Sequence, residues 1–110
     1  MYILEKEVWI SAAHHLPEYS GDCNHVHGHN WRIIVTCQCK DNELAGGMVI
    51  DFKEITSICH SLDHQNLNDF SGLDNPTAEN IAKYLCVRIP RCTKIAIYES
   101  EGSKAVYIKE

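Results

Sequence analysis

The chain has 110 residues, of which 45% are hydrophobic and 23% are charged, and its formal net charge is −5. This composition is typical of a globular protein and excludes a disordered segment, and the acidic balance argues against a nucleic-acid partner, because phosphates favour clustered Lys and Arg. No run approaches the ~18 apolar residues of a membrane span, and charges near the N-terminus argue against a signal peptide. We therefore expect a single domain over residues 1–110, in the cytoplasm and away from membranes.

Two strands are predicted at the start of the chain, because hydropathy alternates over residues 2–14 and again over residues 27–40. One face of the first strand carries Val8, Ile10, Ala12 and His14, and one face of the second carries His27, His29, Trp31, Ile33, Val35 and Cys37. Residues 15–26 contain Pro, Gly, Asp and Asn, which is typical of a loop. We expect the two runs to pair as a long antiparallel hairpin.

Two helices and two short strands are predicted in the rest of the chain. Apolar residues recur at helical spacing from Phe52 to Leu62, after a capping signal at Asp51, and again from Ala78 to Ile89, before Pro90. Residues 63–76 look irregular. The final strands carry Ile95, Ile97 and Glu99 on one face of the first, and Val106 and Ile108 in the second. The order ββααββ predicts an α+β fold, a four-stranded antiparallel sheet with both helices on one face.

Five of the six cysteines have a different sequence setting from the sixth. Six cysteines in a short chain could form a disulfide scaffold, but the absence of an export signal argues against it. Five lie within or beside apolar segments, where a free thiol acts as a small hydrophobic group: Cys37, Cys39, Cys59, Cys86 and Cys92. The sixth, Cys23, lies in a histidine-rich loop.

Three histidines are predicted to converge on one metal ion. His27 and His29 lie on the same side of a strand, ~6.5–7 Å apart along the backbone, and the hairpin brings His14 beside them. Gly28 is expected to give backbone clearance behind the ligands. Three neutral imidazoles with an open fourth position predict a catalytic Zn²⁺ site, although the spacing alone also allows Fe²⁺ or Co²⁺. The alternative is that a His-Gly-His run is merely tolerated at a strand edge.

The loop cysteine is the first of two further chemical groups. Cys23 lies four residues before His27 and should approach the metal. A thiol beside a cation and imidazoles ionises readily, so it can act as a base or nucleophile. The alternative is that Cys23 is the fourth ligand of a structural Cys/His₃ zinc site.

The second group is the adjacent pair Asp63 and His64. A carboxylate beside an imidazole can set the tautomer and basicity of a proton carrier. Adjacent residues of a strand point apart, so the pair requires a turn, or a partner elsewhere for Asp63. The other histidines are expected in solvent or around the site without binding the metal: His15, His25 and His60.

With these residues identified, the sequence resembles the 6-pyruvoyl-tetrahydropterin synthase/6-carboxytetrahydropterin synthase family along essentially its whole length. Six motifs arrive in family order: S-A-A-H at 11–14, C-x3-H-G-H at 23–29, D-F at 51–52, L-D-H-x-x-L-N at 62–68, N-P-T-A-E-N at 75–80 and Y-E at 98–99. The resemblance implies the tunnelling fold (T-fold) and a homohexamer of two trimers. It also implies active sites at subunit boundaries, with Asp63 and His64 supplied by a different subunit than the zinc ligands.

The resemblance also implies roles for single residues. The family's zinc triad corresponds to His14, His27 and His29, its catalytic cysteine to Cys23, and its Asp-His pair to Asp63 and His64. The acidic residue that anchors the pterin ring corresponds to Glu99. A carboxylate suits that role, because it can accept both donors of the pterin's 2-amino and N3–H edge. Thr77 is expected to be a second pterin contact.

Substrate and product follow from the same resemblance. Family members act on 7,8-dihydroneopterin triphosphate, and the short C-x3-H-G-H spacing is similar to the enzymes of the queuosine and 7-deazapurine route. We therefore expect a zinc-dependent lyase that forms 6-carboxy-5,6,7,8-tetrahydropterin, acetaldehyde and triphosphate. The alternatives are formation of 6-pyruvoyl-tetrahydropterin, cleavage of a dihydroneopterin side chain in folate synthesis, or a non-catalytic, zinc-stabilised pterin-binding module.

Overall fold

The computed structural model describes residues 1–21 and 24–110. Its elements are β1 (Tyr2–His14), β2 (His27–Cys39), the 3₁₀ turn η2 (Asp41–Glu43), α1 (Phe52–His60), the 3₁₀ turn η3 (Leu67–Asp69), α2 (Ala78–Arg88), β3 (Cys92–Ser100) and β4 (Ser103–Ile108). The order of strands and helices confirms the predicted ββααββ arrangement. Within the described ranges, no helix has the length and apolar character needed to cross a membrane.

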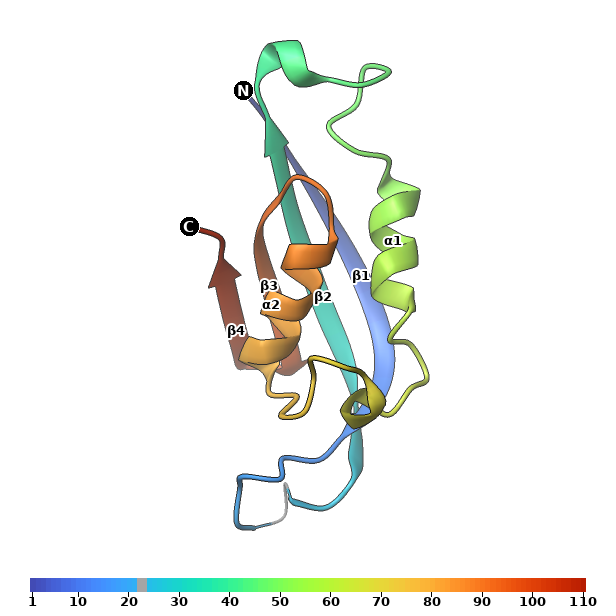
Figure 1. Cartoon of the computed structure of the whole chain (residues 1–110), viewed down its shortest axis with the longest axis vertical. Coiled ribbons are helices and arrows are strands. Elements are labelled where there is room, and N and C mark those ends of the chain that lie inside the picture. Colours follow the sequence, from blue (N-terminus) through green and yellow to red (C-terminus); the bar gives the residue numbers. More distant parts are fainter. Residues whose placement is uncertain (22–23) are drawn as a thin grey trace.

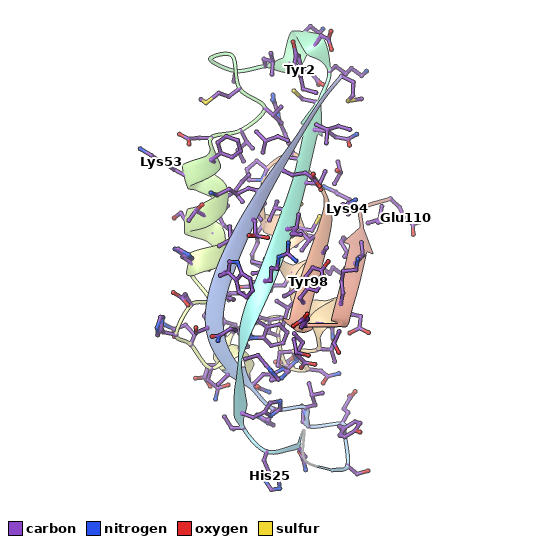
Figure 2. The ribbon with its side chains drawn as sticks, turned by 180° about the vertical axis from the view of Figure 1, so that it is seen from behind. Tyr2, His25, Lys53, Lys94, Tyr98 and Glu110 are labelled. Carbon is purple, nitrogen blue, oxygen red and sulfur yellow. The ribbon has the colours of Figure 1, made fainter. Side chains whose placement is uncertain are left out.

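The four strands form one antiparallel sheet in the order β1-β2-β3-β4. Both helices lie on one face of this sheet, and the view from behind shows the strands in front of the helices (Figures 1 and 2). The molecule is elongated, with extents of 50 × 26 × 24 Å. β1 and β2 extend past the shorter strands, so the loop after β1, with His25 at its far side, lies at the end opposite Tyr2 (Figure 2).

The core lies between the sheet and the helices, and the alternation of the strands places it there. Val8, Ile10, Ile33, Val35, Ile95 and Ile97 face it from the strands, and Ile55, Ile81 and Leu85 face it from the helices; all are buried. The predicted status of five cysteines is also confirmed, since Cys37, Cys39, Cys59, Cys86 and Cys92 are free and buried. Burial raises the pKa of both the Cys59 and the Cys86 thiol to about 12, so these side chains are neutral core groups.

Each helix begins at a side-chain cap. Asp51 accepts the backbone N–H of Lys53, at 2.8 Å, as the sequence predicted. Thr77 accepts the backbone N–H of Asn80 at the start of α2, at 3.1 Å. The helical spacing extended to Leu62, but α1 ends at His60, and Leu62 is buried from the turn that follows.

Candidate active site

The three predicted histidines converge at one end of the β1–β2 hairpin. His14 is directly opposite His27 in the register, and His29 is opposite Ala12. The ring centroids are 4.6 Å apart for His14 and His27, 5.2 Å for His14 and His29, and 4.8 Å for His27 and His29. The predicted geometry of the triad is therefore confirmed.

Trp31 forms the floor of this cluster. It is fully buried, and its ring lies 5.0 Å from that of His14 and 5.2 Å from that of His29, both edge to face. Its indole N–H donates to the Ala12 carbonyl at 3.2 Å, which ties the floor to β1. The sequence placed Trp31 on the histidine face but gave it no role in the site. The sequence signal for this role was a bulky residue two positions after His29, on the same face of the strand.

The outer ring nitrogens of two histidines are held by backbone carbonyls. The Nδ1 of His14 lies 2.8 Å from the Pro76 carbonyl oxygen, and the Nδ1 of His27 lies 2.7 Å from that of His25. A carbonyl only accepts, so each Nδ1 carries the proton and each Nε2 keeps its lone pair. This is the arrangement found around metal-binding histidines, whose second nitrogen donates to a fixed partner.

The inner nitrogens of two of the histidines have no hydrogen-bond partner among the described residues. The Nε2 atoms of His14 and His29 are buried and unpartnered, although the same Glu99 carboxylate oxygen lies 3.2 Å from each. A lone pair beside a carboxylate oxygen is repulsive unless a cation or a proton lies between them. One ring nitrogen from each histidine and one Glu99 oxygen all lie within 4.8 Å of one another. This donor set fits a divalent metal ion.

Burial keeps two of the imidazoles neutral. It lowers the pKa of His14, and the nearby His27 lowers it further, against the raising effects of the Pro76 carbonyl and Glu99. Burial also lowers the pKa of His29, with Glu99 opposing it. Only a neutral imidazole has a lone pair for a metal, so the low pKa values prepare the cluster to bind a cation near neutral pH.

The predicted Asp-His pair lies in a turn that docks on the edge of β1. The Nδ1 of His64 is 3.1 Å from one oxygen of Asp63, whose other oxygen accepts the Ser11 N–H at 2.8 Å. The His64 N–H donates to the Ser11 carbonyl, and φ of His64 is 60°, a left-handed conformation that lets the neighbouring side chains meet. The Ser11 N–H and His64 together lower the pKa of Asp63.

The turn continues along β1 as an edge clamp, which we define as residues 63–68. The Ala13 N–H donates to the Gln65 carbonyl at 3.0 Å. The side-chain amide of Asn68 then accepts the His15 N–H and donates to the His15 carbonyl, both at 2.9 Å. The clamp therefore satisfies the outer backbone groups of β1 on both sides of His14, a role that the irregular sequence of this segment did not predict.

A surface cavity of about 400 Å³ lies beside the pair and is lined by His64, by His29 of the triad and by hairpin residues such as Ser11 and Asn30, which alternate to the face opposite the histidine side chains. Gly28 also lines this cavity. A Cβ at Gly28 would lie 3.9 Å from the Ala12 carbonyl oxygen, an ordinary contact, so no described atom of this chain requires a glycine here. Cys23, the predicted catalytic thiol, lies outside the described residues.

Comparison with known proteins decides the family. A sequence model of the family described as 6-pyruvoyl tetrahydropterin synthase matches residues 3–110. The chain belongs to this family.

Relatives within the 6-pyruvoyl tetrahydropterin synthase family include two enzymes named 6-carboxy-5,6,7,8-tetrahydropterin synthase. The one from Synechocystis is 32% identical to this chain, over 97% of the chain and 93% of the relative. The one from Bacillus subtilis is also 32% identical, over 94% and 83%. The solved structure of 6-pyruvoyl tetrahydropterin synthase from Caenorhabditis elegans superposes with a TM-score of 0.77 at 25% identity, over 99% of this chain and 96% of that one. The predicted T-fold is therefore confirmed.

The two residues expected to contact the pterin, Glu99 and Thr77, lie in different parts of the structure. Glu99 is half-buried near the end of β3, on the histidine side of the sheet, and contacts His14 and His29 as described. Thr77 is half-buried at the start of α2, where its hydroxyl oxygen caps the helix. Its hydroxyl proton is still available for donation to a ligand. Of the remaining histidines, His25 supports the site through its carbonyl, and His60 is exposed.

Proposed function

We propose that this protein is a zinc-dependent lyase that converts 7,8-dihydroneopterin triphosphate and one water molecule to 6-carboxy-5,6,7,8-tetrahydropterin, acetaldehyde and triphosphate. The observation that carries the proposal is the set of unpartnered, neutral imidazole nitrogens of His14 and His29 beside His27. Two relatives aligned over nearly the whole chain carry the name of this synthase, which supports the 6-carboxy product. We place the reaction in the cytoplasm, in queuosine or 7-deazapurine biosynthesis.

In this proposal His14, His27 and His29 hold a Zn²⁺ ion. When bound, the ion supplies Lewis-acid polarisation of the substrate's side-chain hydroxyl oxygens. Three imidazole ligands leave a coordination place open for those oxygens, as in catalytic rather than structural zinc sites.

The proton transfers are assigned to the chain's own side chains. The thiolate of Cys23 removes a proton from the substrate side chain, and His64 handles protons on the other side while triphosphate leaves and the carbon chain is cleaved. Asp63 is fixed by the Ser11 N–H, so its second oxygen is positioned to hold the His64 Nδ1. This bond directs the His64 Nε2 outward as the exchanging nitrogen.

Glu99 is proposed to bind the pterin ring through its 2-amino and N3–H donors, with Thr77 as a second contact. The short contacts of Glu99 to His14 and His29 support a position at the metal, and they also allow Glu99 to be a fourth metal ligand. The pterin role is favoured because a fourth protein ligand would close the site that the reaction requires to be open.

The active oligomer is proposed to be a homohexamer of two trimers, with sites at subunit boundaries. β1 and β4 are the two edges of the sheet, and the edge clamp covers β1 only near its C-terminal end, from Ser11 onward. The rest of the β1 edge and the β4 edge are open, and an open edge favours pairing with another chain. β4 also exposes apolar side chains, with Val106 46% and Ile108 63% accessible. Ring closure through these edges would cover both features and complete a shallow site with residues of a second subunit.

The test is incubation of the zinc-loaded protein with 7,8-dihydroneopterin triphosphate, followed by product identification by mass. The proposal predicts 6-carboxy-5,6,7,8-tetrahydropterin with equal amounts of acetaldehyde and triphosphate. Two other products would assign the chain to another activity of the family. One is 6-pyruvoyl-tetrahydropterin, and the other is a pterin with a shortened side chain whose ring is still at the dihydro level. Unchanged substrate would favour a pterin-binding module without catalysis.

A further inference from the structure

The support of the metal site continues beyond the histidines into the loop before α2. The Pro76 carbonyl that holds the Nδ1 of His14 belongs to a tight turn, because the Thr77 N–H donates to the Asn75 carbonyl at 2.8 Å. This i to i+2 bond is a γ-turn, and its centre suits Pro76, whose ring fixes φ near the value required. The carbonyl of the central residue is then free to face His14.

Asn80 is the side chain that holds this turn in place. From the first turn of α2 its amide nitrogen donates to the Asn75 carbonyl at 2.8 Å, so that oxygen accepts two hydrogen bonds. The Asn80 backbone N–H donates to the Thr77 hydroxyl, which fixes the same turn to the helix from its other side. A chain of three contacts therefore joins Asn80 to His14, the most deeply buried of the three histidines.

We infer that Asn80 is a positioning residue of the metal site, which holds the Asn75–Pro76–Thr77 turn so that the Pro76 carbonyl fixes His14 with Nε2 directed at the metal. The alternative is that Asn80 only stabilises the start of α2. The two roles differ in what they predict for the tautomer of His14 and for metal affinity. The inference rests on the metal site of the proposed function, not on the reaction.

The informative variant is Asn80→Asp. Asp has nearly the same shape and is favourable in the first turn of a helix, so α2 should be retained. A carboxylate cannot donate, and it repels the Asn75 carbonyl, so the turn loses its support. The matched control is Asp51→Ala, which removes the cap of α1 at a bond to Lys53 and has no contact with the turn.

Two measurements test the inference on the full chain. In metal-free protein, long-range ¹H–¹⁵N NMR should report His14 with its proton on Nδ1, and Asn80→Asp should shift the population toward the other tautomer. Chelator competition should give a dissociation constant for Zn²⁺ about tenfold higher for Asn80→Asp than for the wild type, the lower end of the effect of losing such support. Asp51→Ala should lower thermal stability and leave both readouts unchanged.

The outcomes separate this inference from the proposed function. Wild-type tautomer and wild-type zinc affinity in Asn80→Asp would overturn the inference alone. Equal losses of zinc affinity in Asn80→Asp and Asp51→Ala would also overturn it, because a general loss of stability would then explain the effect. A wild-type protein without measurable zinc affinity would overturn the proposed function, whereas the NMR measurement would still decide whether Asn80 controls His14.

Discussion

Single atoms determine what the site can bind. His14 has one nitrogen committed to the Pro76 carbonyl and the other directed at an oxygen of Glu99 without a hydrogen bond. A second proton on His14 would remove the repulsion between this nitrogen and the Glu99 oxygen, but burial lowers the pKa of His14 and so disfavours that proton. A metal cation removes the repulsion, because the cation accepts the imidazole lone pair and attracts the Glu99 carboxylate.

Asp63 has two roles that substitution can separate. Asp63→Asn keeps an oxygen for the Ser11 N–H but loses the charge beside His64, so we expect near-native stability and turnover reduced about 10²-fold. Asp63→Ala should lose the same activity and also about 1 kcal/mol of unfolding free energy, because the hydrogen bond is removed. Steady-state kinetics and urea unfolding at neutral pH measure the two effects.

The pH dependence of the unfolding free energy shows separately whether the Asp63 carboxylate contributes to stability. The folded pKa of Asp63 is lowered, so its contribution is present above the pKa of the unfolded chain, about 3.9, and is lost as the pH falls through the lower folded value. Asp63→Asn should lack this acid-side loss. Full turnover in the Asn variant would refute the role of the carboxylate in proton transfer.

Substitution of Glu99 tests whether this residue contacts the substrate or binds the metal. Its pterin role predicts that Glu99→Gln retains one zinc per chain and raises KM at least tenfold, because an amide can accept only one of the two pterin donors well. Metal analysis after dialysis and steady-state kinetics are the measurements. Loss of zinc from Glu99→Gln would instead identify Glu99 as a ligand.

At the scale of elements, the edge clamp of residues 63–68 fixes the end of β1 that carries His14. Asn68→Ala removes both bonds between its amide and the His15 backbone, so we expect about 1–2 kcal/mol of lost stability and faster amide exchange at His15. Hydrogen-exchange NMR measures the second effect. The control is Asn30→Ala, which removes a bond to the Ser11 hydroxyl on the helix-free face and should leave exchange at His15 unchanged.

The elements differ in how far the sequence predicts them. Alternation and helical spacing place the strands, the helices and the convergence of His14, His27 and His29, because periodic burial leaves a periodic pattern. The edge clamp has no such pattern, since it forms bonds between side chains such as Asn68 and the backbone of a distant strand. The Pro76 carbonyl is likewise a backbone atom whose position no residue type specifies.

At the scale of the whole molecule, complementation tests whether two subunits build each site. Cys23→Ala and His64→Ala should each be inactive as pure proteins while still binding zinc. If Cys23 and His64 of one site come from different subunits, co-assembled 1:1 mixtures should recover about one quarter of wild-type activity, since both positions are then intact by chance in that fraction of sites. A mixture of Cys23→Ala and Cys23→Ser is the control and should stay inactive.

A mixture that stays inactive, although native mass spectrometry detects mixed oligomers, would place both residues of a site on one chain. Each subunit would then supply both proton-transfer residues of its own site.

The most direct test of the account is zinc X-ray absorption spectroscopy of the metal-loaded protein. Three imidazole ligands and an open place predict one zinc per chain with three nitrogen neighbours at about 2.0–2.1 Å, an oxygen neighbour and no sulfur. A sulfur neighbour at about 2.3 Å would identify a closed site completed by a cysteine, and fewer than three imidazole neighbours would contradict the assignment of His14, His27 and His29.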